Sequence, residues 1–206
     1  MIKVAYADVS ELDLSESYDL LPETRKKKVD NFRFLKDKKL SAGAYLLLDK
    51  MLGEENITEP QFKTGRYGKA YISNHEDIYF NLSHSGKIVA CAISDMEVGV
   101  DVEITDPEID LNIARNYFYN SEYENIMKSD NPSEEFFKYW VLKESYMKYT
   151  GLGFNLSLDS FEIILDDEIK LKNNDELKFN LFEIKNYKLA VCSQYNLEKI
   201  HEYHLI

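Results

Sequence analysis

Two carboxylates stand two residues apart in a segment that alternates strictly, Val98-Gly99-Val100-Asp101-Val102-Glu103. In a β-strand this alternation places the three valines on one face and Asp101 and Glu103 together on the other. Like charges held side by side repel each other unless a cation lies between them. Magnesium suits such a pair, because it takes oxygen ligands and is commonly held by a few carboxylates plus substrate phosphate. The alternative interpretation is an exposed strand face of an acidic protein.

A third carboxylate lies in a segment of helical character, Trp140-Val141-Leu142-Lys143-Glu144-Ser145-Tyr146-Met147-Lys148. Trp140, Glu144 and Lys148 are spaced by four and therefore share one helix face. Glu144 lies along the edge of an apolar stripe, where a lone carboxylate needs a partner. Either Lys148 supplies that partner as an ordinary i,i+4 pair, or Glu144 completes the metal site and Lys148 contacts a phosphate as a point charge.

A polar segment precedes an apolar run over 87–94 and reads Asn81-Leu82-Ser83-His84-Ser85-Gly86. Its imidazole and hydroxyl groups could donate to phosphate oxygens at a strand edge. A structural or surface histidine is the alternative. Adjacent residues of a strand point to opposite faces, so Ser83 and His84 are not expected to pair as nucleophile and base.

A basic cluster interrupts a chain whose net charge is −12. It consists of Arg25, Lys26, Lys27, Lys28, Arg33, Lys36, Lys38 and Lys39. Such a cluster could face a phosphate or an acidic partner, and a solvated helix face is the alternative. The overall acidic sign argues against nucleic acid as a partner.

The elements that position these groups form two similar sets. Helices are predicted over 23–52, with a break, and from Pro132 to about Tyr149, where Asn131 caps the helix and Glu134 completes a capping box. Strands are predicted near 160–166, 178–184 and 187–193. The segment 187–193 resembles 86–92 at an offset of 101 residues. We therefore expect an N-terminal lobe over 1–100 and a C-terminal lobe over 101–206, both α+β, with a ligand cleft between them.

The composition fits this organisation. The chain has 206 residues, 44% of them hydrophobic, which is enough for one sizeable unit or two small lobes. The first residues alternate like a strand, and no apolar run resembles a signal peptide or a membrane span. Cys91 and Cys192 lie in apolar runs and are predicted to be free, buried thiols. A cytoplasmic protein without a membrane partner is expected.

Taken together, the segments 81–86, 98–103 and 140–148 resemble the three signature motifs of 4'-phosphopantetheinyl transferases. The similarity is to the surfactin-synthetase type, the monomeric, double-length branch of that family. The order, the spacing and the total length agree, and the resemblance covers nearly the whole chain. It implies two pseudo-symmetric α+β lobes of the 4'-phosphopantetheinyl transferase fold, with coenzyme A bound between them.

The resemblance also implies a reaction. A serine of an apo acyl or peptidyl carrier protein attacks the β-phosphate of coenzyme A, phosphopantetheine moves to that serine, and adenosine 3',5'-bisphosphate leaves. Asp101, Glu103 and Glu144 match the family's magnesium ligands, His84 with Ser83 matches the pyrophosphate contact, and Lys148 matches a lysine that meets the α-phosphate. Glu144, a water near the metal, or Glu122 would take the serine proton.

In the first half, the resemblance implies further contacts to coenzyme A. Arg25 and Lys28 match basic residues at the 3'-phosphate, and Ser41 matches a hydroxyl of the same pocket. Gly68 and Lys69 match the adenine-side loop. Two departures stand out: Leu40 replaces a usual arginine, which could reroute the contact through Lys38 or Lys39, and Ala70 replaces a usual proline.

Two other functions use the same residues. A different magnesium-dependent phosphoesterase or nuclease could use the three carboxylates. A non-catalytic binding module would leave them as a solvated face without metal affinity. For the transferase, exposed apolar residues after Glu103, namely Ile109, Leu111 and Ile113, are expected to dock the carrier.

Overall fold

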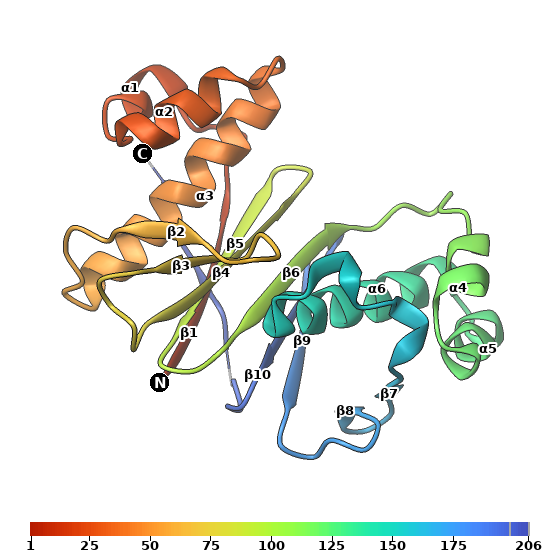
Figure 1. Ribbon diagram of the computed structural model, residues 1–206. Helices are drawn as coiled ribbons and strands as arrows, with labels where there is room; N and C mark the ends of the chain where they lie inside the picture. Colours follow the sequence, from red (N-terminus) through yellow and green to blue (C-terminus); the bar gives the residue numbers. More distant parts are fainter. Residues whose placement is uncertain (198, 206) are drawn as a thin grey trace.

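The structure is a computed structural model that describes residues 1–197 and 199–205. The first half begins with strand β1 and continues through three helices to two β-hairpins (Figure 1). These elements are β1 (Ile2–Asp8), α1 (Leu14–Tyr18), α2 (Glu23–Asp30), α3 (Leu35–Glu54), β2 (Phe62–Thr64), β3 (Ala70–Ile72), β4 (Tyr79–Ser85) and β5 (Ile88–Ser94).

The second half repeats this order of elements. A strand is again followed by three helices, a short hairpin and a long hairpin. The elements are β6 (Gly99–Ile104), α4 (Asn112–Tyr117), α5 (Asn120–Lys128), α6 (Pro132–Thr150), two 3-10 turns (Gly153–Asn155 and Leu158–Ser160), β7 (Ile163–Leu165), β8 (Ile169–Leu171), β9 (Lys178–Ile184) and β10 (Tyr187–Ser193). The α+β class predicted from the sequence is confirmed.

The two main sheets share one connectivity. The first has the order β11-β1-β5-β4 and the second β6-β10-β9. In each sheet, the second strand of the long hairpin pairs antiparallel with the first strand of its half: β5 pairs with β1 and β10 with β6. Cys91 therefore lies opposite Ala5, and Cys192 lies opposite Gly99. The segments related by 101 residues are thus β5 and β10. The boundary expected at residue 100 falls inside β6, so we propose the junction in the link between β5 and β6.

The two halves are joined by a shared core. One apolar cluster lies in the first half, around α3, and a second in the second half, around α6. A third cluster draws on both sheets and includes Val4, Ala90, Val100, Val102 and Leu189. Every residue of β5 and of β10 is buried, because a helix covers one face of each strand and the opposite sheet the other. Cys91 and Cys192 are free and buried, as predicted.

The helix boundaries predicted from the sequence are close to those observed, with one difference in capping. The predicted break in the first helical segment separates α2 from α3 at residues 31–34. Asn131 accepts a hydrogen bond from the backbone N–H of Glu134 and starts α6, and Gly151, in the left-handed region at φ 68°, ends it. The Glu134 carboxylate does not complete a capping box. It pairs instead with Lys188 at 2.5 Å, because β10 brings that ammonium to the start of α6.

The last strand returns to the first half of the fold. β11 (His201–Glu202) pairs in parallel with β1, opposite Ala5 and Tyr6. Tyr203 donates its backbone N–H to the Tyr6 carbonyl at 2.8 Å and its hydroxyl to Glu54 at 2.6 Å. Within the described residues, none of the helices combines the length and the hydropathy that crossing a bilayer requires.

Candidate active site

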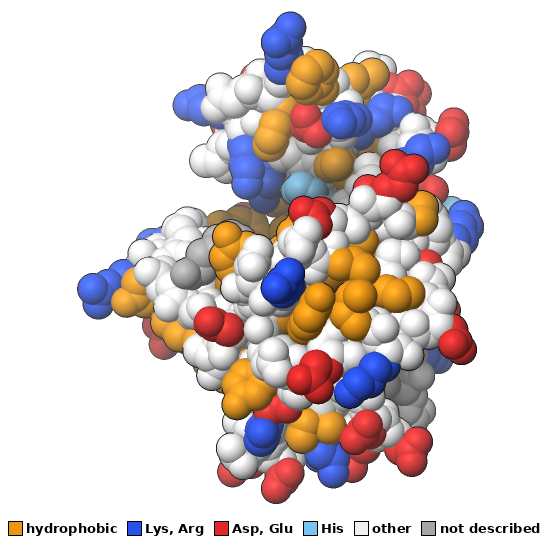
Figure 2. All heavy atoms as spheres, turned by 90° about the vertical axis from the view of Figure 1, so that its right-hand side faces the viewer, with side chains coloured by type: hydrophobic (Ala, Val, Ile, Leu, Met, Phe, Trp, Pro, Cys, Tyr) orange, Lys and Arg blue, Asp and Glu red, His pale blue; other side chains and the backbone are white. Residues whose placement is uncertain are grey.

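A cavity of about 650 Å³ opens between the two halves. The first half contributes α2, α3, the β2–β3 turn and β4 to its walls, and the second half contributes the C-terminal end of α6. In Figure 2 a notch separates the upper mass, which contains α1 and α2, from the body below, and Lys and Arg side chains gather on that upper mass. The cavity therefore joins a cationic region to the second half of the chain.

The carboxylates of β6 are held by the serines of β4. The segment 79–85 is itself a strand, and Asn81, Ser83 and Ser85 accept hydrogen bonds from the backbone N–H groups of residues 100, 102 and 104 of β6. Ser83 Oγ donates in turn to Asp101 Oδ1 at 2.8 Å, and Ser85 Oγ donates to Glu103 Oε2 at 2.6 Å. These side chains accept from the backbone N–H groups of β6, which is an edge strand of the second sheet, and the two serines hold both carboxylates in place.

Lys148 provides the counter-charge of Asp101. Its Nζ lies 2.6 Å from Asp101 Oδ1 and 2.9 Å from Ser83 Oγ. Asp101 is 2% exposed, and its second oxygen, Oδ2, is buried without a hydrogen-bond partner among the described residues. The i,i+4 pair of Lys148 with Glu144, one of the two alternatives that the sequence left open, is absent from the ion pairs among the described residues, where Lys148 pairs with Asp101.

Glu144 faces these two acids from α6. In the part of the chain that the structure describes, its buried Oε1 has no hydrogen-bond partner. Burial, and after it the charge of Asp101, raises the pKa of the Glu144 carboxyl to about 7. Burial also raises the pKa of Glu103, although the hydrogen bond from Ser85 opposes this shift. The charges of Asp101 and Glu103 both contribute to the raised pKa of Glu144, so Glu144 lies within electrostatic range of the two strand acids.

The donor set fits a magnesium ion. Carboxylate oxygens are the ligands that magnesium prefers, and two of these oxygens are buried and unpaired. Among residues 1–197 and 199–205, no three Asp, Glu, His or Cys side chains are gathered closely enough to form a ready-made metal cluster. The ammonium of Lys148 occupies one side of Asp101 instead.

His84 lies in the cavity wall, on the face of β4 opposite Ser83. Partial burial lowers the pKa of the imidazole, and the nearby Lys148 charge lowers it further. Ser83 is buried and is not among the cavity-lining residues, so its hydroxyl serves Asp101 and the β6 backbone. The sequence argument that Ser83 and His84 point to opposite faces agrees with this arrangement.

The cationic end of the cavity is built by Arg25 and Lys28 of α2. Burial lowers the pKa of each, and within the described part of the chain neither forms an ion pair. The Arg25 guanidinium lies 5.3 Å from the centre of the Tyr45 ring. Ser41, 5% exposed, lines the same cavity, and its hydroxyl has no hydrogen-bond partner within residues 1–197 and 199–205. Two cations and an unpaired hydroxyl facing a cavity are suited to an anion.

The structure shows the positions of Leu40 and Ala70, the two residues of the first half that depart from the family pattern. Leu40 is buried in the core of the first half. Neither Lys38 nor Lys39 lines the main cavity, and Lys39 Nζ donates to the Ser10 carbonyl at 2.8 Å, so the expected rerouting through these lysines is not found. Ala70 packs partly against the same core.

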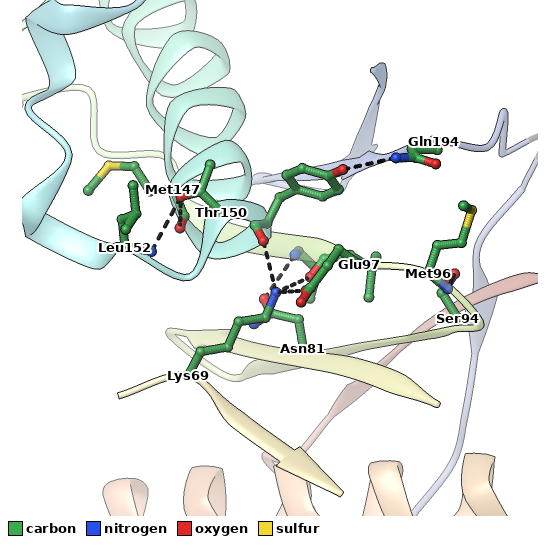
Figure 3. Close-up of polar contacts among 12 residues, drawn as sticks. Lys69, Asn81, Ser94, Met96, Glu97, Met147, Thr150, Leu152 and Gln194 are labelled. Carbon is green, nitrogen blue, oxygen red and sulfur yellow. Dashed lines mark hydrogen bonds and ion pairs between the residues drawn. The ribbon is translucent and has the colours of Figure 1, made fainter. Parts of the chain in front are cut away.

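Lys69 lies in the cavity wall, next to Gly68, whose φ of 95° requires glycine. Figure 3 shows its ammonium directed at protein groups: it donates to Glu97 Oε2, to the Val98 carbonyl and to the Tyr149 carbonyl. This network was not foreseen from the sequence, because the three acceptors lie 28 to 80 residues away along the chain.

Glu122 is fully buried and does not line the cavity. It pairs with Lys143 at 2.7 Å and accepts hydrogen bonds from the backbone N–H groups of Tyr119 and Ile163. The structure therefore gives Glu122 a structural position that links α5, α6 and β7. The apolar residues expected to dock a carrier, Ile109, Leu111 and Ile113, pack partly against the core of the second half.

Comparisons with known proteins identify a family to which the chain is similar. The profile of the 4'-phosphopantetheinyl transferase superfamily matches residues 97–197, which include β6 and α6. The chain is 36% identical over 141 residues, 65% of its length, to 4'-phosphopantetheinyl transferase Sfp of Bacillus subtilis, and 34% identical over 159 residues, 74% of its length, to 4'-phosphopantetheinyl transferase gsp of Aneurinibacillus migulanus. The matched regions span 62% and 65% of those two relatives. The chain belongs to the 4'-phosphopantetheinyl transferase superfamily.

Proposed function

We propose that the protein transfers the 4'-phosphopantetheine group of coenzyme A to a serine of an apo acyl or peptidyl carrier protein and releases adenosine 3',5'-bisphosphate. Membership of the superfamily supports the type of reaction. We further propose that the enzyme depends on magnesium, is monomeric and cytoplasmic, and has neither nucleic acid nor a membrane as a partner.

The observation that carries the proposal is the cavity with two different charged ends. Within the described residues, Arg25, Lys28 and Ser41 offer unpaired donors at one end, and His84 and Lys148 line the other, where Lys148 pairs with the carboxylate of Asp101 behind the cavity wall. Coenzyme A has the matching chemistry, a 3'-phosphate at a distance from a pyrophosphate. Because the fold fixes the side chains at both ends of the cavity, these side chains would orient the nucleotide before the reaction.

In the proposed reaction the serine oxygen forms a bond to the β-phosphorus, and the bond from that phosphorus to the bridging oxygen breaks. Lys148 and His84 would contact the pyrophosphate oxygens, where charge increases as the leaving group departs. Glu144, with its unpaired Oε1, or a water beside it would receive the serine proton. Bound to Asp101, Glu103 and Glu144, magnesium would neutralise pyrophosphate charge.

A mass measurement tests the proposal. The protein is incubated with coenzyme A, magnesium and several apo carrier proteins of different pathways, and each carrier is weighed by mass spectrometry. We expect one carrier or more to gain one phosphopantetheine group, and the gain to disappear with a chelator. An unchanged mass for every carrier, with adenosine 3',5'-bisphosphate released from coenzyme A alone, would favour a phosphoesterase instead.

A further inference from the structure

Lys69 belongs to the turn between β2 and β3, yet its side chain contacts two distant parts of the fold. Its Nζ lies 2.6 Å from Glu97 Oε2, 3.1 Å from the Val98 carbonyl oxygen and 3.0 Å from the Tyr149 carbonyl oxygen. The side chain is 18% exposed, whereas that of Glu97 is 47% exposed. Lys69 is thus the enclosed partner of the pair, and Figure 3 shows all three acceptors converging on its nitrogen.

The ammonium has no donor left for a ligand. A lysine side chain offers three N–H groups and no acceptor, and here the number of protein acceptors equals the number of donors. Two of the acceptors are backbone carbonyls, which lose this hydrogen bond if the ammonium turns away. A contact to coenzyme A through this nitrogen would leave a carbonyl without its partner, at a cost comparable to a lost hydrogen bond.

The groups that Lys69 joins are those that carry the carboxylates. Val98 stands immediately before β6, which contains Asp101 and Glu103. Tyr149 follows Lys148 directly and lies little more than one helical turn after Glu144. One side chain of the first half therefore touches both elements of the second half that build the metal site.

These two elements also touch each other without intervening side chains. A Cβ placed on Gly99 would lie 2.0 Å from the Ser145 carbonyl oxygen and 2.4 Å from the Tyr149 nitrogen, so the backbone of β6 packs directly on that of α6. A Cβ on Gly151 would lie 3.2 Å from Cδ of Lys69. The end of α6 is therefore enclosed by β6 on one side and by the lysine stem on the other.

We propose that Lys69 is a positioning residue: its ammonium fixes the end of α6 and the start of β6 on the β2–β3 turn, and thereby holds Glu144 and Lys148 in register with Asp101 and Glu103. The effect on turnover rests on the proposed function, whereas the bracing of the fold does not. Lys69 acts through these side chains and not as a charge on the nucleotide.

The test compares Lys69→Met with Glu97→Gln and with Lys128→Met, a control that removes a lysine from an exposed ion pair on α5. Amide hydrogen exchange of the ligand-free proteins is followed in peptides covering residues 97–101 and 145–152. Steady-state kinetics then give kcat and the KM for coenzyme A. Glu97→Gln retains an oxygen acceptor for Lys69 and should fold, so the comparison stays informative even if Lys69→Met does not fold.

We expect Lys69→Met to exchange faster in both peptides and to lose about tenfold or more in kcat, since misplacement of catalytic groups by about 1 Å can cost 10²-fold. The KM for coenzyme A should change by less than about threefold on the same reasoning, because no donor of Lys69 reaches the ligand. Glu97→Gln should show a smaller change in the same direction, and Lys128→Met none.

A ligand contact would give the opposite pattern. Lys69→Met would then raise the KM for coenzyme A with kcat and exchange unchanged, and Glu97→Gln would lower that KM because the loss of the carboxylate charge weakens the hold on the ammonium. Either result overturns the proposal, as does unaltered exchange in both peptides. If the wild-type protein modifies no carrier, the exchange data still decide whether Lys69 braces the fold, so the two proposals fail independently.

Discussion

Replacing Glu122 by Gln separates a structural from a catalytic role for this residue. Both side chains of the pair it forms with Lys143 are 1% exposed, and the two charged groups lie 2.7 Å apart. Glutamine is nearly isosteric, but it removes the countercharge of a buried ammonium. It also turns an NH₂ group toward one of the backbone N–H groups that now donate to the carboxylate.

The expected loss of stability is large. Breaking a buried ion pair from one side costs about 3–5 kcal/mol, because the remaining charge stays desolvated. For a chain of this length, about 1 kcal/mol shifts Tm by roughly 2–4 °C, so Tm should fall by roughly 6–20 °C. The double variant Glu122→Gln, Lys143→Met should be more stable than Glu122→Gln alone, since it no longer buries an unpaired charge.

Thermal denaturation followed by circular dichroism measures the shift, and kcat is determined well below the lower Tm. Glu124→Gln on the same helix is the control, because its pair with Lys128 is exposed and should be worth no more than about 1 kcal/mol. We expect the kcat of folded Glu122→Gln to stay close to that of the wild type. A Tm within about 2 °C of wild type together with a kcat reduced by about 10²-fold would refute the structural role.

Two further predictions concern the cationic wall of the cavity and the acidic pair of β6. Arg25→Ala should weaken the binding of coenzyme A by about 10- to 100-fold, which corresponds to the loss of a charge-assisted hydrogen bond, and should weaken the binding of 3'-dephospho-coenzyme A less. Calorimetric titration compares the two affinities, and equal losses would exclude a contact of Arg25 with the 3'-phosphate. Glu103→Gln should lower magnesium affinity by about tenfold or more, with little change in the Tm of the metal-free protein, because Ser85 can still donate to the amide oxygen. Full activity of that variant at limiting magnesium would contradict the assignment of Glu103.

The sequence predicts features that depend on neighbours along the chain. The alternation around Asp101 and Glu103 correctly indicates a strand, and Asn131 with Pro132 correctly marks the start of α6. The offset of 101 residues correctly relates β5 to β10. Such patterns follow from backbone periodicity and local capping, so they do not require knowledge of the tertiary fold.

Contacts between distant segments could not be predicted in this way. Nothing near Glu122 indicates that Lys143 and the start of β7 will enclose it. The acceptors of the Lys69 ammonium could not be predicted either, since the local sequence, a lysine beside a glycine turn, suggests a ligand contact. The alternation of Asn81, Ser83 and Ser85 is the one local hint of the ladder to β6, but its partner strand lies 19 residues further on.

The return of the chain to β1 has a consequence for the order of folding. β1 precedes the other elements described, yet its residues Ala5 and Tyr6 gain their second strand neighbour only from β11, nearly 200 residues later in the chain. Until that segment has left the ribosome, the first sheet exposes an unpaired apolar strand, which is a template for association with other chains. Such a long-range pairing is also slow to form. We therefore expect nascent chains that stop short of residue 201 to depend on chaperones more than the finished protein does.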